Sequence, residues 1–471
     1  MAFTFLWARA RNGPVFGLLV ALLVGLSESV VYYSQWILSD PLFLALTMGA
    51  LFALERAGPR GSADAGDVVA AREESRDWLW LVAGVLLAGL AYFTRSAGLP
   101  LILALLGVLA LRRSWTRLAG SAVALGIPMA LWWLRGRGEG VAQYGTEFWM
   151  VDPYQPALGT IGPPGLVPRI FENLEAYVFR HGPAGVVGSD GPALAAIGVG
   201  LTLAGLTGWV LSARRQVGLT ELFFPLYAGL ILVWPAVWGG DRFALPLYPL
   251  LFLYGAVALD ALWGRVPRIV ANAVTAAVAL VLMLPAAGNW LDTTRQVEQC
   301  SRAAERAGPW ACYGARVGYF AAAAAWMSEA LPEGSAVLTR KPRHFYTLSG
   351  HPSRTFPFGE DPDVLIGLAD EVGARYVLLD RWDGLAGRYV GGAVRARPAA
   401  FCYVRGFGEP AEGGAQLLGI LPPGARGQVG ASGAAEVGIA PCPAGEYASP
   451  GAGPERYSSS TSIPLLADLD S

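Results

Sequence analysis

Four ionisable side chains interrupt long apolar stretches of this sequence and are the residues best suited to chemistry. Asp40 follows "SQWILS", Arg95 lies in "AGLAYFTRSAGLP", and Asp241 and Arg242 lie in "WGGDRFALPLYPLL". In such surroundings a carboxylate can accept a proton or hold a cation, and a guanidinium can bind two phosphate oxygens at once. Charged groups are costly within apolar segments, so these four are candidates for a functional site.

Each of these residues also has a structural explanation. Asp40 precedes Pro41, and an Asp-Pro pair suits the first turn of a helix, which the carboxylate can cap. Arg95 and Arg242 can reach lipid headgroups or pair with a nearby acid. Because Asp241 and Arg242 are adjacent in the sequence, we expect them to bind different partners.

A Gly- and Pro-rich segment of roughly residues 135–190 carries further polar side chains. Glu147 is a weaker candidate for a catalytic carboxylate, chosen only for its place in this segment. Glu28, His181 and Asp260 are interpreted as structural or solvated residues.

The elements that must hold these residues are membrane helices. Of 471 residues, 54% are hydrophobic and only 15% are charged, whereas a soluble protein of this length needs more surface charge. The formal net charge of -1 indicates no basic surface for nucleic acid. Apolar runs predict a mainly α, polytopic helical bundle over residues 1–289 with about nine spans. The runs lie near residues 14–34, 41–55, 78–94, 98–111, 118–134, 191–211, 220–238, 243–263 and 268–288.

Arginines set the predicted orientation of this bundle, because every second loop is basic. These loops carry Arg9 and Arg11, then Arg56, Arg60, Arg72 and Arg76, then Arg112, Arg113 and Arg117, then Arg214 and Arg215, and finally Arg265 and Arg268. Positive residues favour cytoplasmic loops. We therefore expect an integral plasma (inner) membrane protein with a cytoplasmic N-terminus. The four candidate residues, the 135–190 loop and everything after the ninth span then lie on the extracytoplasmic face.

From about residue 290 the composition becomes that of a globular domain. The segments "SAVLTR", "ARYVLLDRW", "FCYVRGFG" and "AQLLGILP" predict strands, and "DPDVLIGLADEVG" predicts a helix. A small extracytoplasmic α/β domain is therefore expected over residues 290–423. Residues 424–471 are rich in Gly, Ala, Pro and Ser and are expected to be disordered.

All four cysteines, Cys300, Cys312, Cys402 and Cys442, lie in this C-terminal part. An even number outside the membrane indicates two disulfides. Of the three possible pairings we prefer Cys300–Cys312 with Cys402–Cys442. The basic stretch "RKPRHFYTLSGHPS" could meet an anionic lipid or a phosphate, but a solvated surface is the preferred interpretation.

Several segments together resemble the GT-C superfamily of membrane glycosyltransferases. They are "YYSQWILSDPLFLALTMGALFALERA", "LAGLAYFTRSAGLPLILALLGVLALRR" and "GDRFALPLYPLLFLYGA", followed by "AAWMSEALPEGSAVLTRKPRHFYTLSGHPSRTFPF" and "EVGARYVLLDRW". Their order and spacing over roughly residues 5–390 are similar to the bacterial branch near the protein mannosyltransferases and the lipid A aminoarabinose transferases.

The resemblance implies transfer of a sugar from a polyprenyl-phosphate donor to a lipid, glycan or protein acceptor at the outer face of the bilayer. Asp40 matches the family's second acidic position, which helps to bind donor phosphate or a divalent metal (Mg²⁺, Mn²⁺ or Zn²⁺). Arg95 and Arg242 match recurrent arginines, and Asp241 accompanies them as a substrate-binding candidate. A carboxylate must accept the acceptor's proton, and Asp40 and Glu147 are the candidates in this sequence.

Members of that family normally begin with one further span and a large outer loop whose acid is the catalytic base. "AFTFLWARARNG" resembles the end of the family's second span, so we expect this base to be missing from the sequence given. The alternative to an enzyme is a non-catalytic protein that binds lipid-linked sugars or serves as an accessory subunit. A transporter is less favoured, because no internal repeat is evident and the ionisable residues gather at the outer rim.

Overall fold

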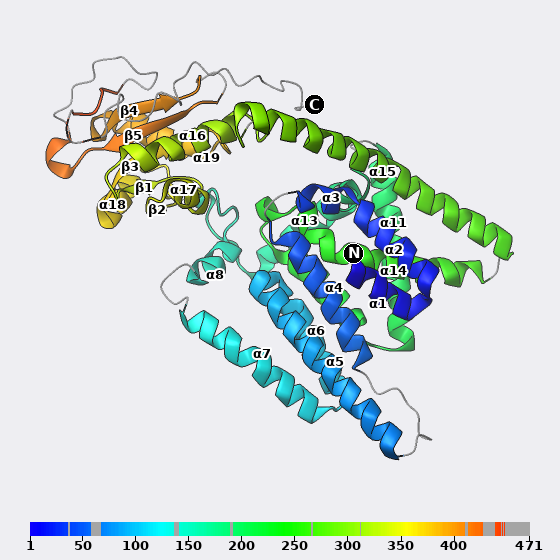
Figure 1. The fold of residues 1–471 in the computed structure, drawn as a ribbon. Coiled ribbons are helices and arrows are strands. Elements are labelled where there is room, and N and C mark those ends of the chain that lie inside the picture. Colours follow the sequence, from blue (N-terminus) through cyan, green and yellow to red (C-terminus); the bar gives the residue numbers. More distant parts are fainter. Residues whose placement is uncertain are drawn as a thin grey trace. The chain divides into compact units, whose positions relative to one another are not determined.

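The computed structural model describes residues 1–35, 38–57, 67–135, 141–188, 192–264, 267–310, 312–409, 413–426, 439–443, 445 and 447. The chain divides into two compact units, shown in Figure 1. The first unit comprises Met1–Pro153 and Thr160–Arg295, and the second comprises Tyr154–Gly159 and Gln296–Ser471. Each unit is described by itself.

The first unit is helical. Its elements are α1 (Ala2–Asn12), α2 (Pro14–Leu26), α3 (Glu28–Ser34), α4 (Asp40–Arg56), α5 (Asp67–Thr94), η1 (Ser96–Gly98), α6 (Leu99–Leu111), α7 (Trp115–Arg135), α8 (Val141–Trp149), η3 (Pro163–Gly165), α9 (Leu166–Ala176), η4 (Tyr177–His181), α10 (Gly182–Val187), α11 (Pro192–Arg215), α12 (Leu219–Val233), η5 (Ala236–Trp238), α13 (Asp241–Ala244), η6 (Leu245–Leu247), α14 (Tyr248–Trp263) and α15 (Arg268–Ala307), the last of which continues into the second unit.

Each of the nine apolar runs contains a helix, but fewer helices can cross a membrane unaided. Among the described residues, length and composition qualify four segments, namely Asp77–Thr94, Trp115–Arg135, Ala195–Arg215 and Asp241–Trp263. A fifth is obtained if α2 and α3, which meet at an angle of 60°, form one bent span. A polytopic membrane protein is therefore supported, whereas the prediction of nine spans is not confirmed.

The helices of the first unit pack around one apolar core. Its fully buried side chains include Trp7, Met48 and Phe223. Close approach of α11 and α14 depends on Gly208, where an added Cβ would lie 1.7 Å from the backbone oxygen of Tyr254. Small residues are the usual means by which membrane helices come this close. In Figure 1, α4 and α5 run side by side along this core.

The residues before the first apolar run form a helix of this core. Trp7 and Ala8 of α1 are fully buried. After the turn at Gly13, α2 runs back along α1, so that a Cβ added to Gly25 would lie 3.3 Å from the sulfur of Met1. The cytoplasmic orientation was predicted from Arg9 and Arg11, which lie in the last turn of α1. That turn is at the opposite end of the α1–α2 pair from Met1, and the orientation stays a prediction.

The second unit contains a five-stranded sheet in the order β2-β1-β3-β5-β4. Its elements are η2 (Pro156–Leu158), α16 (Ala315–Ala330), β1 (Ala336–Leu338), α17 (Pro342–Ser349), β2 (Ser353–Arg354), α18 (Pro362–Val372), β3 (Ala374–Leu379), α19 (Leu385–Ala396), η7 (Pro398–Ala400), β4 (Phe401–Phe407), β5 (Ala415–Ile420) and η9 (Pro423–Ala425). β1 is parallel to β2 and β3, whereas β5 is antiparallel to β3 and β4. The strands and the helix expected from the sequence are confirmed.

Alternation along β3 gives this sheet two apolar faces. Val377 and Leu379 belong to the cluster that α18 and α19 cover, whereas Tyr376 and Leu378 belong to the cluster that includes α16 and α17. Side chains of successive strand residues point to opposite faces, so one buried strand can serve both clusters. The result is an α/β domain with helices on both sides of the sheet.

Two disulfides occur in the second unit, Cys300–Cys312 and Cys402–Cys442, which is the pairing preferred from the sequence. The predicted disordered tail from 424 lies mostly outside the described residues. Within its described part, however, Tyr403 donates its backbone N–H to the oxygen of Ala440 at 2.8 Å. The Tyr447 hydroxyl donates to the oxygen of Ile420 at 2.7 Å. These contacts join Ala440 and Tyr447 to β4 and β5 near Cys442, and the prediction for the rest of the tail stays a prediction.

Candidate functional site

Asp40 and Arg95 form a buried ion pair at one end of α4 and α5. Ser39 is the N-cap of α4 and makes no side-chain capping bond, and Asp40 is the first helical residue. The Arg95 guanidinium donates to the Asp40 carboxylate, and the two side chains are only 16% and 4% exposed. The carboxylate therefore binds an arginine instead of capping the helix, although its negative charge also suits a helix N-terminus.

Phe243 brings the second arginine to this pair. The guanidinium carbon of Arg95 lies 4.9 Å from the centroid of the Phe243 ring, and that of Arg242 lies 4.8 Å from the same centroid. Two cations thus flank one aromatic ring, whose π face attracts positive charge. The structure brings together Asp40, Arg95 and Arg242, as the sequence analysis expected, and Phe243 is the residue that joins them.

Asp241 is held by hydroxyl groups from a distant part of the chain. Its carboxylate accepts hydrogen bonds from Ser29 Oγ at 2.5 Å and from Tyr33 Oη at 2.8 Å. Asp241 and Arg242 therefore bind different partners, although they are neighbours in α13.

The bend between α2 and α3 is what carries Ser29 and Tyr33 to Asp241. At Ser27 the backbone leaves the helical region, and the Ser27 hydroxyl donates to the oxygen of Val24 at 2.7 Å. The helix axis then changes direction by 60°. Because Ser29 and Tyr33 are four residues apart on α3, they lie on the same helical face. The four-residue spacing of Ser29 and Tyr33 is visible in the sequence. The bend at Ser27 that directs this face of α3 toward Asp241 was not predicted.

A π-helical turn, η4, and two tyrosines complete the surroundings of Asp241. η4 contains His181 and contacts α13. Tyr248 Oη donates to the backbone oxygen of Asp241 at 3.5 Å. π-helical turns are rare and often occur at functional sites. Glu28, interpreted from the sequence as structural, also interacts electrostatically with Asp241 and thus adds a second carboxylate to this neighbourhood.

Among the contacts that the structure describes for this cluster, none involves Glu147. Glu147 is half-buried in α8 and takes part in other interactions. α8 and the residues after it are held by Arg169, a buried residue that donates to the oxygen of Phe148 at 2.6 Å and also to the oxygen of Met150. The catalytic role of Glu147 therefore remains a prediction from its place in the loop.

A divalent metal does not fit the residues around Asp40. The partner of Asp40 is a guanidinium, which cannot ligate a metal. Over the described part of the chain, no group of three or more His, Cys, Asp and Glu side chains could hold an ion. We therefore derive no step through a metal.

The tip of the 135–190 loop belongs to the second unit. The loop forms a narrow hairpin, with a bridge between Met150 and Thr160. At the tip, the Tyr154 ring lies 5.3 Å from the Arg340 guanidinium carbon. The Tyr389 hydroxyl donates to the backbone oxygen of Tyr154 at 2.5 Å. This tip is therefore held by contacts within the second unit.

Arg340 thus has defined partners, although the sequence analysis preferred a solvated surface for its basic stretch. Its side chain is 12% exposed and pairs with Asp383 at 2.6 Å. Lys341 reaches the same carboxylate at 4.0 Å. These contacts are internal to the α/β domain.

The comparisons with known proteins are limited. No protein-family model matches the sequence, and no curated protein matches it. Similar solved structures include the oligosaccharyltransferase of Archaeoglobus fulgidus tethered with an acceptor peptide containing the NVT sequon (15% identity, TM-score 0.49) and its apo form (15%, 0.46). A third is the enzyme, AglB, in complex with an inhibitory peptide and a dolichol-phosphate (16%, 0.44).

Each comparison covers 88% of this chain and 61% of the archaeal one, so the chain spans less than two thirds of that protein. Because all three TM-scores are below 0.5, the similarity carries no argument about fold or activity.

Proposed function

We propose that this protein is a membrane glycosyltransferase that takes a sugar from a polyprenyl-phosphate donor at the extracytoplasmic face. The observation that supports this most is the pair of guanidiniums, Arg95 and Arg242, on the Phe243 ring. Among the described contacts, Arg95 is balanced by Asp40, whereas Arg242 binds the ring and no carboxylate. A half-buried guanidinium in this position suits a phosphate, which it can hold through two oxygens.

The reaction follows from these charges. The bond between the anomeric carbon and a phosphate oxygen breaks, and a new bond forms between that carbon and the acceptor oxygen. Negative charge develops on the departing phosphate, where Arg242 and Arg95 would stabilise it. The acceptor's proton passes to a carboxylate. Asp241 and Glu28 are the carboxylates of this cluster that bind no guanidinium among the described contacts.

In this proposal Asp40 is a positioning residue. Its carboxylate fixes the Arg95 guanidinium, and because that guanidinium engages it we assign it no proton-transfer step. This assignment differs from the sequence prediction that Asp40 binds a metal or acts in catalysis. Glu147 is retained as an alternative proton acceptor, since the acceptor substrate is unidentified.

The extracytoplasmic location is part of the proposal. In this proposal the loop with the Tyr154–Gly159 tip and the α/β domain lie on that face, and two disulfides in the domain suit an oxidising compartment. The basic turns at the other end of the bundle suit the cytoplasmic side of a plasma (inner) membrane.

The second candidate is a non-catalytic protein that binds lipid-linked sugars. The observation that favours it is the engagement of Asp40 by Arg95, which leaves the arginine cluster without an evident strong base. Such a protein would bind the donor phosphate through the same arginines and transfer nothing.

The test uses the full-length protein in lipid vesicles with labelled polyprenyl-phosphate sugars and a panel of lipid, glycan and peptide acceptors. Removing one group that stabilises transition-state charge typically lowers the rate by about 10²–10³-fold. We expect a loss of this size for Arg242→Gln and a marked loss for Asp40→Ala. Arg295→Gln is the control, because Arg295 is 72% exposed and pairs only locally with Asp292.

The outcomes separate the two candidates. Transfer by the parent that Arg242→Gln abolishes supports the enzyme. Saturable binding of the donor without transfer, lost in Arg242→Gln, supports the accessory protein. Donor binding and transfer that are equal in Arg242→Gln and in the parent would refute the proposed site.

A further inference from the structure

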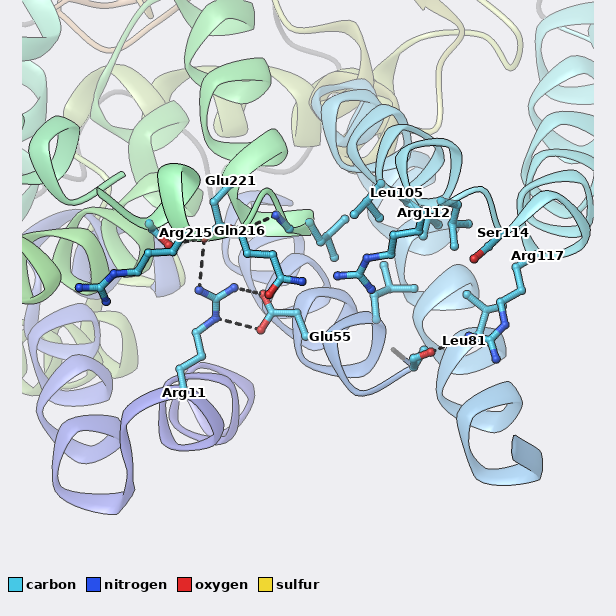
Figure 2. A pocket seen from close by; sticks show the side chains of 17 residues that line it. Arg11, Glu55, Leu81, Leu105, Arg112, Ser114, Arg117, Arg215, Gln216 and Glu221 are labelled. Atoms are coloured by element: carbon cyan, nitrogen blue, oxygen red, sulfur yellow. Dashed lines mark hydrogen bonds and ion pairs between the residues drawn. The ribbon is translucent and has the colours of Figure 1, made fainter. Parts of the chain in front are cut away.

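A second polar cavity lies at the other end of the helical bundle. It has a volume of about 320 Å³ and is shown in Figure 2. Asp40 and Glu55 are at opposite ends of α4, and at 1.5 Å per residue they are separated by about 23 Å along the helix. Glu55 lines this cavity, so the cavity is distinct from the arginine cluster around Phe243.

Four arginines line the cavity, Arg11, Arg112, Arg117 and Arg215, together with two acids, Glu55 and Glu221. The side chains come from α1, from the ends of α4, α6 and α11, and from the starts of α7 and α12. In Figure 2 the labelled side chains come from several helices around one hollow. The cavity therefore has an excess of positive charge.

The two acids are already engaged by groups of the protein, and their two negative charges are fewer than the four positive charges of the cavity's arginines. Arg11 binds Glu55 through Nε at 3.0 Å and Nη2 at 2.5 Å, and it lies 3.5 Å from Glu221. Glu221 also accepts hydrogen bonds from Ser212 at 2.8 Å and from Tyr254 at 3.3 Å. Arg11 and its two acids thus form one internal network, which leaves the other arginines to determine the charge that a ligand meets.

Arg112 and Arg215 are the arginines available to a ligand. Both are exposed, and the described residues give neither of them a carboxylate partner. Arg117 is half-buried, donates to the oxygen of Ala57 at 2.8 Å, and lies 5.4 Å from the Trp78 ring. Guanidiniums that face one cavity repel each other, and an anion between them removes this repulsion.

Apolar side chains also line the cavity, among them Leu81, Leu105 and Leu109. A water molecule takes roughly 30 Å³ of liquid volume, so the cavity is large enough for a phosphate with part of its glycerol backbone. A cavity lined by both arginines and leucines matches a phosphate headgroup that is joined to acyl chains. Basic pockets between membrane helices on the cytoplasmic side are known to bind anionic headgroups.

We propose that this cavity binds the phosphate-bearing headgroup of an anionic phospholipid. The competing explanation is general: Arg112 follows α6 and Arg215 ends α11, and arginines are favoured at helix C-termini and at membrane surfaces without any specific site. The chain offers a matched control for this explanation. Arg113 and Arg214 are the sequence neighbours of the two cavity arginines, are also exposed, and do not line the cavity.

The experiment measures binding of phosphatidylglycerol and of phosphatidylcholine to the full-length protein in a neutral detergent. A basic residue near an anionic membrane surface contributes about 1 kcal/mol, which corresponds to about a fivefold change in affinity. We expect Arg112→Gln/Arg215→Gln to weaken phosphatidylglycerol binding by roughly 20–30-fold. We expect Arg113→Gln/Arg214→Gln to change it by less than about twofold, and phosphatidylcholine to bind weakly to all three proteins.

Thermal unfolding in lipid-free detergent checks that both variants are folded, and because the substituted side chains are exposed no loss of stability is expected. Equal losses in the two double variants would overturn the proposal in favour of general surface attraction. Unchanged binding in both would overturn it as well. If glycerol phosphate displaces phosphatidylglycerol at the same concentration as the lipid itself, the site recognises a soluble phosphate ester and the assignment to a lipid is wrong.

Discussion

The ion pair between Asp40 and Arg95 allows a prediction whose magnitude follows from burial. With side-chain exposures of 4% and 16%, neither group can regain full hydration when its partner is removed. Breaking a buried pair at one side typically costs about 3–5 kcal/mol, because a charge remains buried and uncompensated. We therefore expect Asp40→Asn and Arg95→Gln each to lower the free energy of unfolding by about this amount.

The double variant distinguishes pairing from packing. In Asp40→Asn/Arg95→Gln both charges are absent, and replacing a whole buried pair by neutral groups is often nearly neutral. The double variant should then be more stable than either single variant, with a coupling energy of at least about 2 kcal/mol. The control is the pair Arg295–Asp292, with exposures of 72% and 65%, for which a coupling below about 0.5 kcal/mol is expected.

The assay is equilibrium unfolding of the six proteins and the parent in mixed micelles, followed by near-ultraviolet circular dichroism. The loss in the double variant could equal the sum of the two single losses within about 0.5 kcal/mol. In that case the two residues would act independently and the reasoning about the pair would be refuted.

Three further predictions concern the α/β domain. Burial raises the pKa of Asp380 to about 6 from its ordinary 3.8. The domain is therefore most stable while Asp380 is protonated, and its free energy of unfolding falls as pH rises from 3.8 through about 6. Asp380→Asn should thus stabilise the domain by about 3 kcal/mol at pH 7.5 and by little at pH 3.5, as measured by thermal unfolding. An equal gain in stability at the two pH values would contradict this prediction. Tyr154→Ala should speed proteolysis of the 141–165 segment by at least about tenfold while Tyr346→Ala, an exposed residue, does not; unchanged cleavage would show that the tip is held by other contacts. Cys402→Ser/Cys442→Ser should lower the free energy of unfolding by about 4 kcal/mol, the entropy of closing a loop of 40 residues, and a loss below about 1 kcal/mol would contradict a structural role.

Much of the architecture was accessible from the sequence because local patterns determine it. Apolar runs predicted where helices lie, and alternation in "ARYVLLDRW" predicted β3. The convergence of Asp40, Arg95 and Arg242 was predicted from topology alone, since each lies at a turn on one side of the bundle. These predictions depend on periodicity and on the position of charges along the chain.

Other features depend on contacts between distant residues and left no local signal. Asp241 meets Ser29 across 212 residues, and this requires the bend at Ser27. In the stretch before Gly13, Arg9 and Arg11 were used to predict orientation, whereas the burial of Trp7 in the core left no local signal. In the sequence, Arg112 and Arg215 were used only to predict the membrane orientation of the bundle. The structure shows that they line one cavity, which sequence separation alone does not reveal.

The hairpin tip has a consequence for the order of synthesis. Tyr154 and Tyr389 are separated by 235 residues, and ribosomes add about 5–20 residues per second. The tip therefore leaves the ribosome roughly 10–50 s before the residue that binds it has been made. During this interval the hydrogen bond between Tyr389 and the Tyr154 backbone oxygen cannot form, so the tip should become fully resistant to protease only after Tyr389 has been made.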